Sequence, residues 1–470
     1  MTAQTILPAN TLSSGYDVAN SIRLNDGDSP RLRNAFGTPT NRKKYTFSAW
    51  MKKGKVGNTS GGTEDTLWGV YTDGSNYSYL RINTGPQFEW KIREGGSTVG
   101  KIQTNALIRD PSAWLHIVVA YDSTQGTAAN RMKMYINGTQ VSSLNTATYV
   151  NQNVETTFNE SGQNLDIGSD GNGAGYFDGY MAEVVFIDGQ QLAADQFGEF
   201  DSDSPTIWKP KDVSGLTFGD NGSYLDFEDS SALGNDVSGN NRDFASTNLA
   251  ATDQSTDTCT NNFATMNPLA ITYSANTFSE GNLKITTISG ASSYNQATIG
   301  VSTGKWFWEV KYVSDTDGSS NYARIGIADI DPPNTGGLGE TEGIAYEAIN
   351  GRKKLRGSQS TYGDTYAPGD IIGVALNLDD NELTFYKNGT AQNSGTAIDI
   401  SSYTPKTGFW HPAFNYDDGS HSGVLEANFG SPSFSISSGN ADGNGYGNFE
   451  YTVPSGYYAL NSKNLAEYGG

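Results

Sequence analysis

Two carboxylates, Asp226 and Glu228, have a spacing that could support acid–base chemistry. Residues two apart on a strand project to the same face. The two catalytic carboxylates of a retaining glycosidase lie about 5 to 5.5 Å apart. Glu183 and Asp188 flank another expected strand, where a structural or turn role is favoured over catalysis. The chemistry of the pair therefore depends on whether Asp226 and Glu228 share one strand.

The chain has three histidines, His116, His411 and His421. His116 alternates with apolar neighbours, so we expect a partly buried, hydrogen-bonded ring. His411 and His421 bracket the segment 416–419, which we expect to be a loop between two strands. For this segment we favour a solvated loop over a metal or glycan site. No phosphate-binding glycine loop and no zinc spacing of Cys and His occurs, and we expect no cofactor.

Aromatic residues next to Asp and Asn in expected loops are candidates for binding sugars or a receptor. Rings can stack on sugar faces while carboxylate and amide groups bind hydroxyls. Core or hairpin packing is the alternative at each position. The candidates are Tyr71, Asp73, Asn76 and Tyr77 in the first half, and Tyr362, Tyr366, Trp410, Tyr416 and Asp417 in the second.

Composition favours an all-β protein of two domains. The 470 residues include 56 Gly, 26 Tyr, 20 Phe and 8 Trp, but only 17% charged residues, a mixture of turn formers and strand-favouring side chains. With 30 basic and 51 acidic residues the formal charge is −21, which argues against nucleic acid as a partner. A single Cys259 excludes an internal disulfide. No apolar run long enough for membrane insertion and no secretory signal is present, so we expect synthesis and assembly in a cytoplasm.

Short apolar or alternating segments separated by Gly, Asn, Asp and Ser predict strands throughout. In the first half they are 45–51, 79–82, 114–121, 131–136 and 181–187, and in the second 305–313, 323–329, 371–378, 383–386, 412–414 and 424–429. Residues 192–200 predict a short helix of about two turns. Residues 206–275 predict a connector with one short strand, 224–227, and long loops.

Each half contains a strand that runs into Asn-Gly. Met132 to Ile136 leads into Asn137-Gly138, and Leu383 to Tyr386 leads toward Asn388-Gly389. Asn-Gly is the favoured pair for a type I′ hairpin, which needs positive φ at both residues. We predict one tight hairpin in each half.

Four segments of the first half resemble the laminin-G-like, concanavalin-like lectin fold. They are 45–53, 114–122, the hairpin 132–138, and 175–184, in the order of that family. Glycosidases on concanavalin-like folds carry a longer Glu-x-Asp-x-x-Glu pattern, which is absent here, so we predict that the chain is not an enzyme. Some laminin-G-like domains bind calcium through rim loops. The resemblance implies Asp170, Asn172 and Asp178 as candidate calcium ligands, although such residues also form tight turns.

The second half resembles a SPRY domain. Residues 304–310 are similar to the opening strand of that family, 368–379 with the 385–389 hairpin to its central signature, and 428–430 to its closing strand. The two resemblances imply two tandem antiparallel β-sandwich (concanavalin-like jelly-roll) domains. We expect an N-terminal arm at 1–20, the laminin-G-like sandwich at 21–205, the connector at 206–275 and the SPRY-like sandwich at 276–470.

The combination of the two halves is similar to structural proteins of tailed, particularly marine, bacteriophages. The residues that carry this similarity are 21–25, 236–240, 261–269, 454–461 and 464–465. It implies a virion protein, as a tail fibre, spike or capsid-decoration knob, that attaches to host-surface polysaccharide or receptor and contacts other virion proteins. A purely architectural role is the alternative. The sequence does not determine whether the chain forms a homo-oligomer, because no heptad or shaft repeat sets the oligomeric state.

Overall fold

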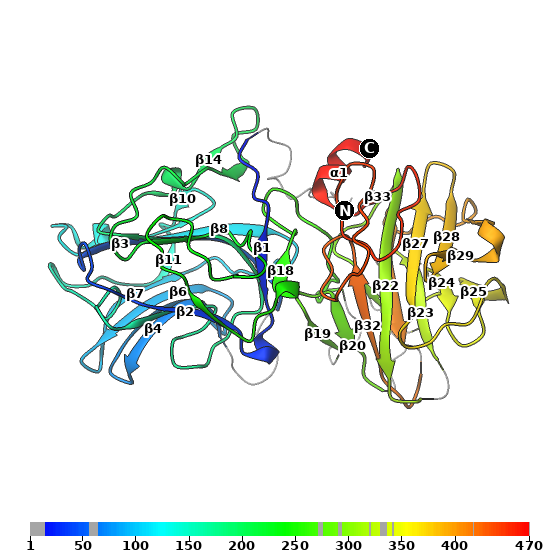
Figure 1. The fold of residues 1–470 in the computed structure, drawn as a ribbon, viewed down its shortest axis with the longest axis horizontal. Helices are drawn as coiled ribbons and strands as arrows, with labels where there is room; N and C mark the ends of the chain where they lie inside the picture. The colour runs from blue at the N-terminus through cyan, green and yellow to red at the C-terminus, as the bar shows by residue number, and fades with distance from the viewer. Residues whose placement is uncertain are drawn as a thin grey trace. The chain divides into compact units, whose positions relative to one another are not determined.

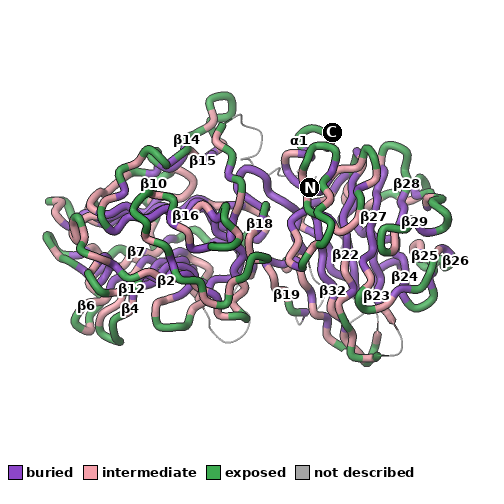
Figure 2. The backbone as a smooth tube through the Cα atoms, viewed as in Figure 1, coloured by how far each residue is buried: buried purple, intermediate pink, exposed green. Residues whose placement is uncertain are grey.

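The computed structural model describes residues 15–55, 64–270, 276–289, 294–318, 321–329, 336–340, 343–416 and 418–469. Its described residues form two compact units, 15–260 and 261–469. Both are antiparallel β-sandwiches (Figure 1). Figure 2 shows mostly buried strands and exposed turns in each unit. Most of the expected arm, 1–14, lies outside the described residues.

The first sheet of the first unit, here called the back sheet, is built around β3 and β13, which pair along most of their length. Its strands in order are β10 (Thr139–Gln140), β9 (Met132–Ile136), β8 (Trp114–Asp122), β3 (Lys44–Lys53), β13 (Gly179–Asp188), β1 (Ser21–Leu24) and β18 (Gln254–Ser255), with β16 (Ser223–Leu225) paired to β13.

The second sheet, here called the front sheet, has eight strands. In order they are β11 (Leu144–Thr148), β7 (Ser97–Thr104), β6 (Phe88–Glu94), β5 (Asn76–Ile82), β4 (Asp65–Asp73), β12 (Asn164–Ile167), β2 (Arg31–Ala35) and β17 (Ala245–Thr247). Short 3-10 turns lie at η1 (Asp26–Asp28), η2 (Ala128–Asn130), η3 (Ala194–Gln196) and η4 (Ala251–Asp253).

The two faces of the back sheet are both covered. In β8, Ile117 and Val119 join the core between the sheets, whereas Val118 and Ala120 join a second apolar cluster. Successive strand side chains point to opposite faces, so the second cluster lies on the outer face. It is completed by residues from the segment 190–260, such as Trp208. The front sheet differs, because half-buried polar residues such as Lys91 and Lys101 alternate with the core residues Trp90, Ile92 and Ile102. Its outer face is therefore polar.

The segment expected as a connector supplies strands to the first sandwich as far as Thr260. Besides β16, β17 and β18, it forms β15 (Trp208–Pro210), which pairs with β14 (Gly198–Phe200). The buried ammonium of Lys52 lies 2.8 Å from Asp257 Oδ2, and both side chains are 1% exposed. Local composition does not show which distant strands a segment pairs with. The composition of the expected connector therefore predicted loops.

The predicted helix at 192–200 is wrong. Only the single 3-10 turn η3 forms, and β14 begins after one further residue, Phe197. Phe197 is buried in the cluster on the outer face of the back sheet. A backbone that has to place Phe197 there and then pair with β15 cannot continue a helix.

The second unit contains a nine-stranded and a six-stranded sheet. The first has β19 (Thr277–Ser279), β20 (Lys284–Thr286), β32 (Gly423–Asn428), β22 (Lys305–Asp315), β27 (Ile371–Asn377), β28 (Glu382–Lys387) and β29 (Thr390–Ala391), with β30 (Ile398–Asp399) on β28 and β33 (Tyr458–Ala459) parallel to β22. The second has β21 (Asn295–Gln296), β31 (His411–Tyr416), β23 (Ala323–Ala328), β24 (Ile344–Glu347), β25 (Arg352–Leu355) and β26 (Ser358–Thr361). η5 (Asn393–Gly395) and α1 (Ser462–Tyr468) complete the unit.

The segment after β32 covers the outer face of the nine-stranded sheet. Phe307 of β22 packs with Phe449 and Val453 of that segment. The fully buried Glu309 carboxylate accepts the backbone N–H of Glu450 at 3.0 Å and of Tyr451 at 2.8 Å. Burial raises the pKa of Glu309 to about 7, against the lowering effect of these donors. Glu309 therefore fastens the C-terminal segment to the sheet.

Both Asn-Gly hairpins are confirmed. Asn137 and Gly138 have φ of 45° and 77°, and Asn388 and Gly389 have φ of 48° and 78°. They connect β9 to β10 and β28 to β29. The predicted strands of both halves also form, within one to three residues at most ends. None of the described helices is long and apolar enough to cross a membrane.

Candidate functional site

Three tyrosines form a row on the outer face of the front sheet. Tyr71 of β4 lies opposite Tyr77 of β5, and Tyr79 follows two residues along β5. The ring centroids of Tyr71 and Tyr77 are 6.2 Å apart and those of Tyr77 and Tyr79 are 5.7 Å apart, with planes inclined by 17° and 11°. The intervening Leu80 points into the core. Strand alternation therefore places three nearly parallel rings on the polar side of the sheet.

Basic side chains of β5 and β6 lie over these rings. The Lys91 Nζ is 5.4 Å from the Tyr77 ring centroid and donates a hydrogen bond to its hydroxyl at 3.2 Å. The Arg93 guanidinium is 5.9 Å from the same centroid, and that of Arg81 is 4.2 Å from the Tyr79 centroid. Such distances allow cation–π attraction. We call Tyr71, Tyr77, Tyr79, Arg81, Lys91 and Arg93 the tyrosine face.

The cations of the tyrosine face differ in their partners. Arg81 pairs with Glu64 at 2.5 Å and with Glu89 at 2.7 Å, and Lys101 lies 2.6 Å from Glu89. Burial opposes ionisation of Glu89, but Lys101 and Arg81 outweigh it and lower the pKa of its carboxyl. Lys91 and Arg93 have no carboxylate within ion-pair distance in the part of the chain that the structure describes. The Nε of Arg93 is buried without a hydrogen-bond partner.

The candidates Asp73 and Asn76 close the turn between β4 and β5. The Asp73 carboxylate accepts the Ser75 backbone N–H at 2.7 Å and the Asn76 amide at 3.1 Å. These contacts lower the pKa of Asp73, the Ser75 bond most. The Asn76 Oδ1 accepts the Gly95 backbone N–H at 2.9 Å. Both side chains therefore hold the turn beside the rings, while Tyr71 and Tyr77 lie on the tyrosine face.

Sequence reasoning missed Tyr79, Lys91 and Arg93. The signal was present, because polar and apolar residues alternate along 79–82 and 88–93. That period of two marks a half-buried strand. Which side chains meet across strands depends on register, which the alternation does not give.

Four aromatic candidates of the second half are buried in its core, which corrects the expectation that they stack on sugars. Tyr362, Tyr366, Trp410 and Tyr416 are 4%, 1%, 3% and 1% exposed. Tyr366 donates hydrogen bonds to the carbonyls of Ala323 and Tyr346. Tyr362 and Tyr366 do lie outside strands, but their loop folds back over the sandwich, so its rings are interior. Asp417 lies outside the described residues.

The three calcium candidates do not share one arrangement. Asp170 Oδ1 accepts the backbone N–H of Asn172 at 2.8 Å and of Ala174 at 3.0 Å, within its own turn. Asp178 is 2% exposed, and its Oδ2 lies 3.9 Å from the Lys55 Nζ. Burial, reinforced by the Asp26 carboxylate, raises the pKa of Asp178 well above its usual value. Calcium binding stays a prediction, and a lysine ammonium already lies beside Asp178.

The histidines have separate surroundings. His116 is 1% exposed, and burial lowers its pKa to about 3. His411 begins β31 and is buried, and its Nδ1 is 3.1 Å from the Ala297 carbonyl. His421 lies 2.8 Å from Asp418 and 3.7 Å from Asp317. Within the described ranges this trio is the one group of three His, Cys, Asp or Glu ligand atoms within 4.8 Å of one another.

Asp226 and Glu228 do not share a strand face. β16 ends at Leu225, and Asp226 Oδ1 accepts the Glu228 backbone N–H at 3.1 Å within a turn. Glu183 is the more perturbed carboxyl. It has φ of 50° at a bulge in β13 and accepts a hydrogen bond from the Tyr224 hydroxyl at 2.7 Å. Burial raises its pKa to about 8.

Comparison with protein families finds two matches. Residues 25–195 match the Concanavalin A-like lectin/glucanases superfamily, and residues 305–416 match the SPRY domain. The chain thus carries a concanavalin-like and a SPRY β-sandwich. Nothing in these matches bears on a bacteriophage origin.

Among curated proteins, an E3 ubiquitin-protein ligase, RKP of Arabidopsis thaliana, is 29% identical over 133 residues, which are 28% of this chain and 10% of the ligase. The SPRY domain of human HERC1 is 17% identical over 34% of this chain and 96% of that domain, with a TM-score of 0.29. A pentraxin from Limulus polyphemus is 16% identical over 39% of this chain and 82% of its own, also with a TM-score of 0.29. Each likeness concerns a part of the chain.

Proposed function

We propose that this chain is a non-enzymatic binding protein whose tyrosine face binds acidic carbohydrate. One observation carries the proposal: Tyr77, stacked on Tyr71, lies beside Lys91 and Arg93, two cations without a carboxylate partner among the described residues. Tyrosine offers an apolar ring with a polar tip. Guanidinium and ammonium groups bind carboxylate or sulfate through charge-assisted hydrogen bonds. Sugars bearing such anions match both features.

The location of the tyrosine face supports the same function. The outer face of the back sheet is covered by apolar residues of 190–260, including Trp208. The outer face of the front sheet instead carries polar and charged residues, with Lys91 and Arg93 half-buried. A rigid sheet positions binding groups more accurately than a loop. Tyr71 and Tyr77 are half-buried and can contact an extended polymer, whereas Tyr79 is only 7% exposed and supports the row from below.

The net charge sets a condition on this proposal. At −21 the chain repels a polyanion as a whole. At physiological ionic strength the Debye length is about 8 Å, so distant charges are screened while contacting charges act. Binding should therefore depend on Lys91 and Arg93 themselves. It should weaken at very low salt, where repulsion by the whole chain extends further.

The proposal includes a place on a virion, as a fibre, spike or capsid-decoration knob with other virion proteins as partners. The sequence resemblance supports this part. In that setting the acidic carbohydrate would be host-surface polysaccharide. The alternative is an architectural protein that docks on particles and binds no glycan.

The test is titration of the full chain with an oligomer of galacturonic acid and with the matching neutral galactose oligomer. We expect saturable binding of the acidic oligomer alone. Replacing both cations (Lys91→Gln with Arg93→Gln) should weaken it by roughly tenfold or more. Lys133→Gln is the matched control, because Lys133 on β9 also lacks a carboxylate partner among the described residues. Binding that is unchanged in the double variant contradicts the tyrosine face.

Two further outcomes would replace the proposal. Absence of saccharide binding together with tight association to purified particles would favour the architectural role. Shortening of the oligomer during the titration, detected by chromatography, would show an enzyme instead.

A further inference from the structure

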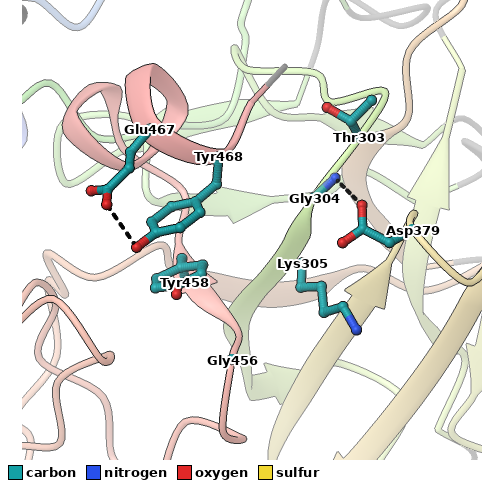
Figure 3. A pocket seen from close by; sticks show the side chains of 8 residues that line it. All are labelled: Thr303, Gly304, Lys305, Asp379, Gly456, Tyr458, Glu467 and Tyr468. Atoms are coloured by element: carbon teal, nitrogen blue, oxygen red, sulfur yellow. Dashed lines mark hydrogen bonds between the residues drawn. The ribbon is translucent and has the colours of Figure 1, made fainter.

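The second unit contains a cavity of about 340 Å³ that is separate from the tyrosine face. Figure 3 shows it between α1 and β33 on one side and the start of β22 on the other. Its aromatic residues come from the C-terminal segment, beyond the part of the chain that matches the SPRY family. The lining residues are Thr303, Gly304, Lys305, Asp379, Gly456, Tyr458, Glu467 and Tyr468.

Two stacked tyrosines form one wall. The ring centroids of Tyr458 and Tyr468 are 3.7 Å apart and their planes are inclined by 9° (Figure 3). Both rings are held by fixed backbone. β33 pairs in parallel with β22, and α1 is capped by the Asn461 side chain, which accepts the Asn464 N–H at 2.9 Å. The buried Asn464 donates to Asp442 at 2.7 Å. The aromatic wall is therefore pre-formed.

The opposite wall requires a glycine. Gly304 has φ of +84°, and a Cβ there would lie 2.6 Å from the Tyr468 carbonyl oxygen. Its backbone N–H donates to Asp379 Oδ1 at 2.9 Å, which holds that carboxylate at the cavity. The close approach of Tyr468 to Gly304 thus brings an aromatic pair and a carboxylate to one space.

The charges at the cavity do not cancel. The Lys305 ammonium lies 3.1 Å from Asp380 and is neutralised by it. Asp379 and Glu467 have no basic partner within ion-pair distance among the described residues. Glu467 instead accepts a hydrogen bond from the Tyr468 hydroxyl at 3.0 Å. The cavity is left with two carboxylates beside π-faces.

We propose that this cavity binds a quaternary ammonium group. Tyrosine rings attract organic cations through the negative face of the ring, and methylated ammonium is the cation that aromatic sites recognise. Methyl groups cover the cation with apolar surface that the rings can contact, and the two carboxylates compensate its charge. The cavity volume is at the small end of ligand sites, roughly 300 to 1,000 Å³, which suits a compact head group.

The experiment is titration of the full chain with tetramethylammonium chloride at constant ionic strength, followed by calorimetry and by tyrosine ring-proton NMR shifts. We expect saturable binding, and none of the neutral isostere 3,3-dimethylbutan-1-ol. Tyr468→Leu removes the π-face and should weaken binding by roughly fivefold or more, whereas Tyr468→Phe should retain it.

Asp379→Asn is a second variant that should keep the fold, because asparagine still offers an oxygen to the Gly304 N–H. It should weaken binding by roughly fivefold. Equal binding of the isostere, no saturation by tetramethylammonium, or unchanged affinity in both Tyr468→Leu and Asp379→Asn would overturn the proposal. Failure of acidic oligosaccharide binding would not, since that site lies in the other unit.

The source of the ammonium group is then distinguished by three probes. Choline, trimethyl-lysine amide and phosphatidylcholine vesicles all carry it, and phosphatidylglycerol vesicles provide the lipid control. Competition of tetramethylammonium with any of the three supports the cavity and identifies the source. Binding to both kinds of vesicle alike, without competition, would contradict it.

Discussion

The Trp208 indole Nε1 donates a hydrogen bond to Nδ1 of His116 at 3.0 Å. Because Nδ1 accepts, the proton of the neutral ring lies on Nε2, which donates to Ser48 Oγ at 2.8 Å. The segment around β15 is thereby attached to the outer face of the back sheet by a buried polar contact as well as by apolar packing.

Trp208→Phe should destabilise the first unit. Phenylalanine keeps an aromatic ring but leaves the buried Nδ1 of His116 without a donor, which costs about 1 to 3 kcal/mol. Urea unfolding followed by far-UV circular dichroism measures the loss. Phe200→Tyr is a nearby control, because Phe200 is 46% exposed. An unchanged midpoint for Trp208→Phe would show that the contact contributes nothing.

His116 should make the first unit acid-labile. Its folded pKa is about 3, below the ordinary value of about 6.5. Between these values the unfolded chain binds a proton that the folded chain does not, so stability is present above about pH 6.5 and is lost as pH falls toward 3. His116→Gln should flatten this part of the stability–pH curve. Parallel curves for the two proteins would contradict the assignment.

Glu183 should act in the opposite direction. Its folded pKa is about 8, above the ordinary value of about 4.3, so the folded chain keeps a proton that the unfolded chain releases. Its contribution is full below about pH 4.3 and is lost as pH rises through 8. Glu183→Gln mimics the neutral carboxyl and should raise the urea midpoint at pH 9 relative to the parent, with little change at pH 5. A gain that is equal at both values would exclude titration of Glu183.

The two hairpin glycines should differ in sensitivity. A Cβ on Gly138 would lie 2.3 Å from the buried Trp208 ring, whereas on Gly389 it would lie 2.7 Å from half-buried Tyr451, which can move. Both have positive φ, so alanine adds strain of roughly 1 kcal/mol at each. We expect Gly138→Ala to lower the thermal midpoint more than Gly389→Ala. The controls are Gly126→Ala and Gly419→Ala, where a Cβ meets nothing within 4 Å.

Asp257→Ala should be strongly destabilising. It removes the carboxylate that lies 2.8 Å from the Lys52 ammonium, which is 1% exposed, and the acceptor of the Trp114 indole N–H. Breaking a buried pair on one side costs about 3 to 5 kcal/mol. The double variant Lys52→Met, Asp257→Leu should recover much of that loss, because both charges of the pair are removed. A double variant as unstable as the single one would show that the charge pair is not the cause.

Local patterns in the sequence determined the strands and the two Asn-Gly hairpins, whereas the two kinds of sandwich were implied by resemblance to two families. These depend on neighbours along the chain: alternation marks a strand, and Asn137-Gly138 or Asn388-Gly389 supplies the positive φ of its turn. The loop positions expected for Tyr71 and Tyr77 are wrong, because both residues lie in strands, β4 and β5.

Only the tertiary structure decided which faces are covered and which residues meet. The pairing of β16, β17 and β18 with the first sandwich, the burial of Tyr362 and Trp410, and the meeting of Tyr77 with Lys91 and Arg93 all depend on register and on segments far apart in sequence. A strand residue has the same local pattern whether its outer face is open or covered. The free energy that selects between the two comes from burial against distant residues.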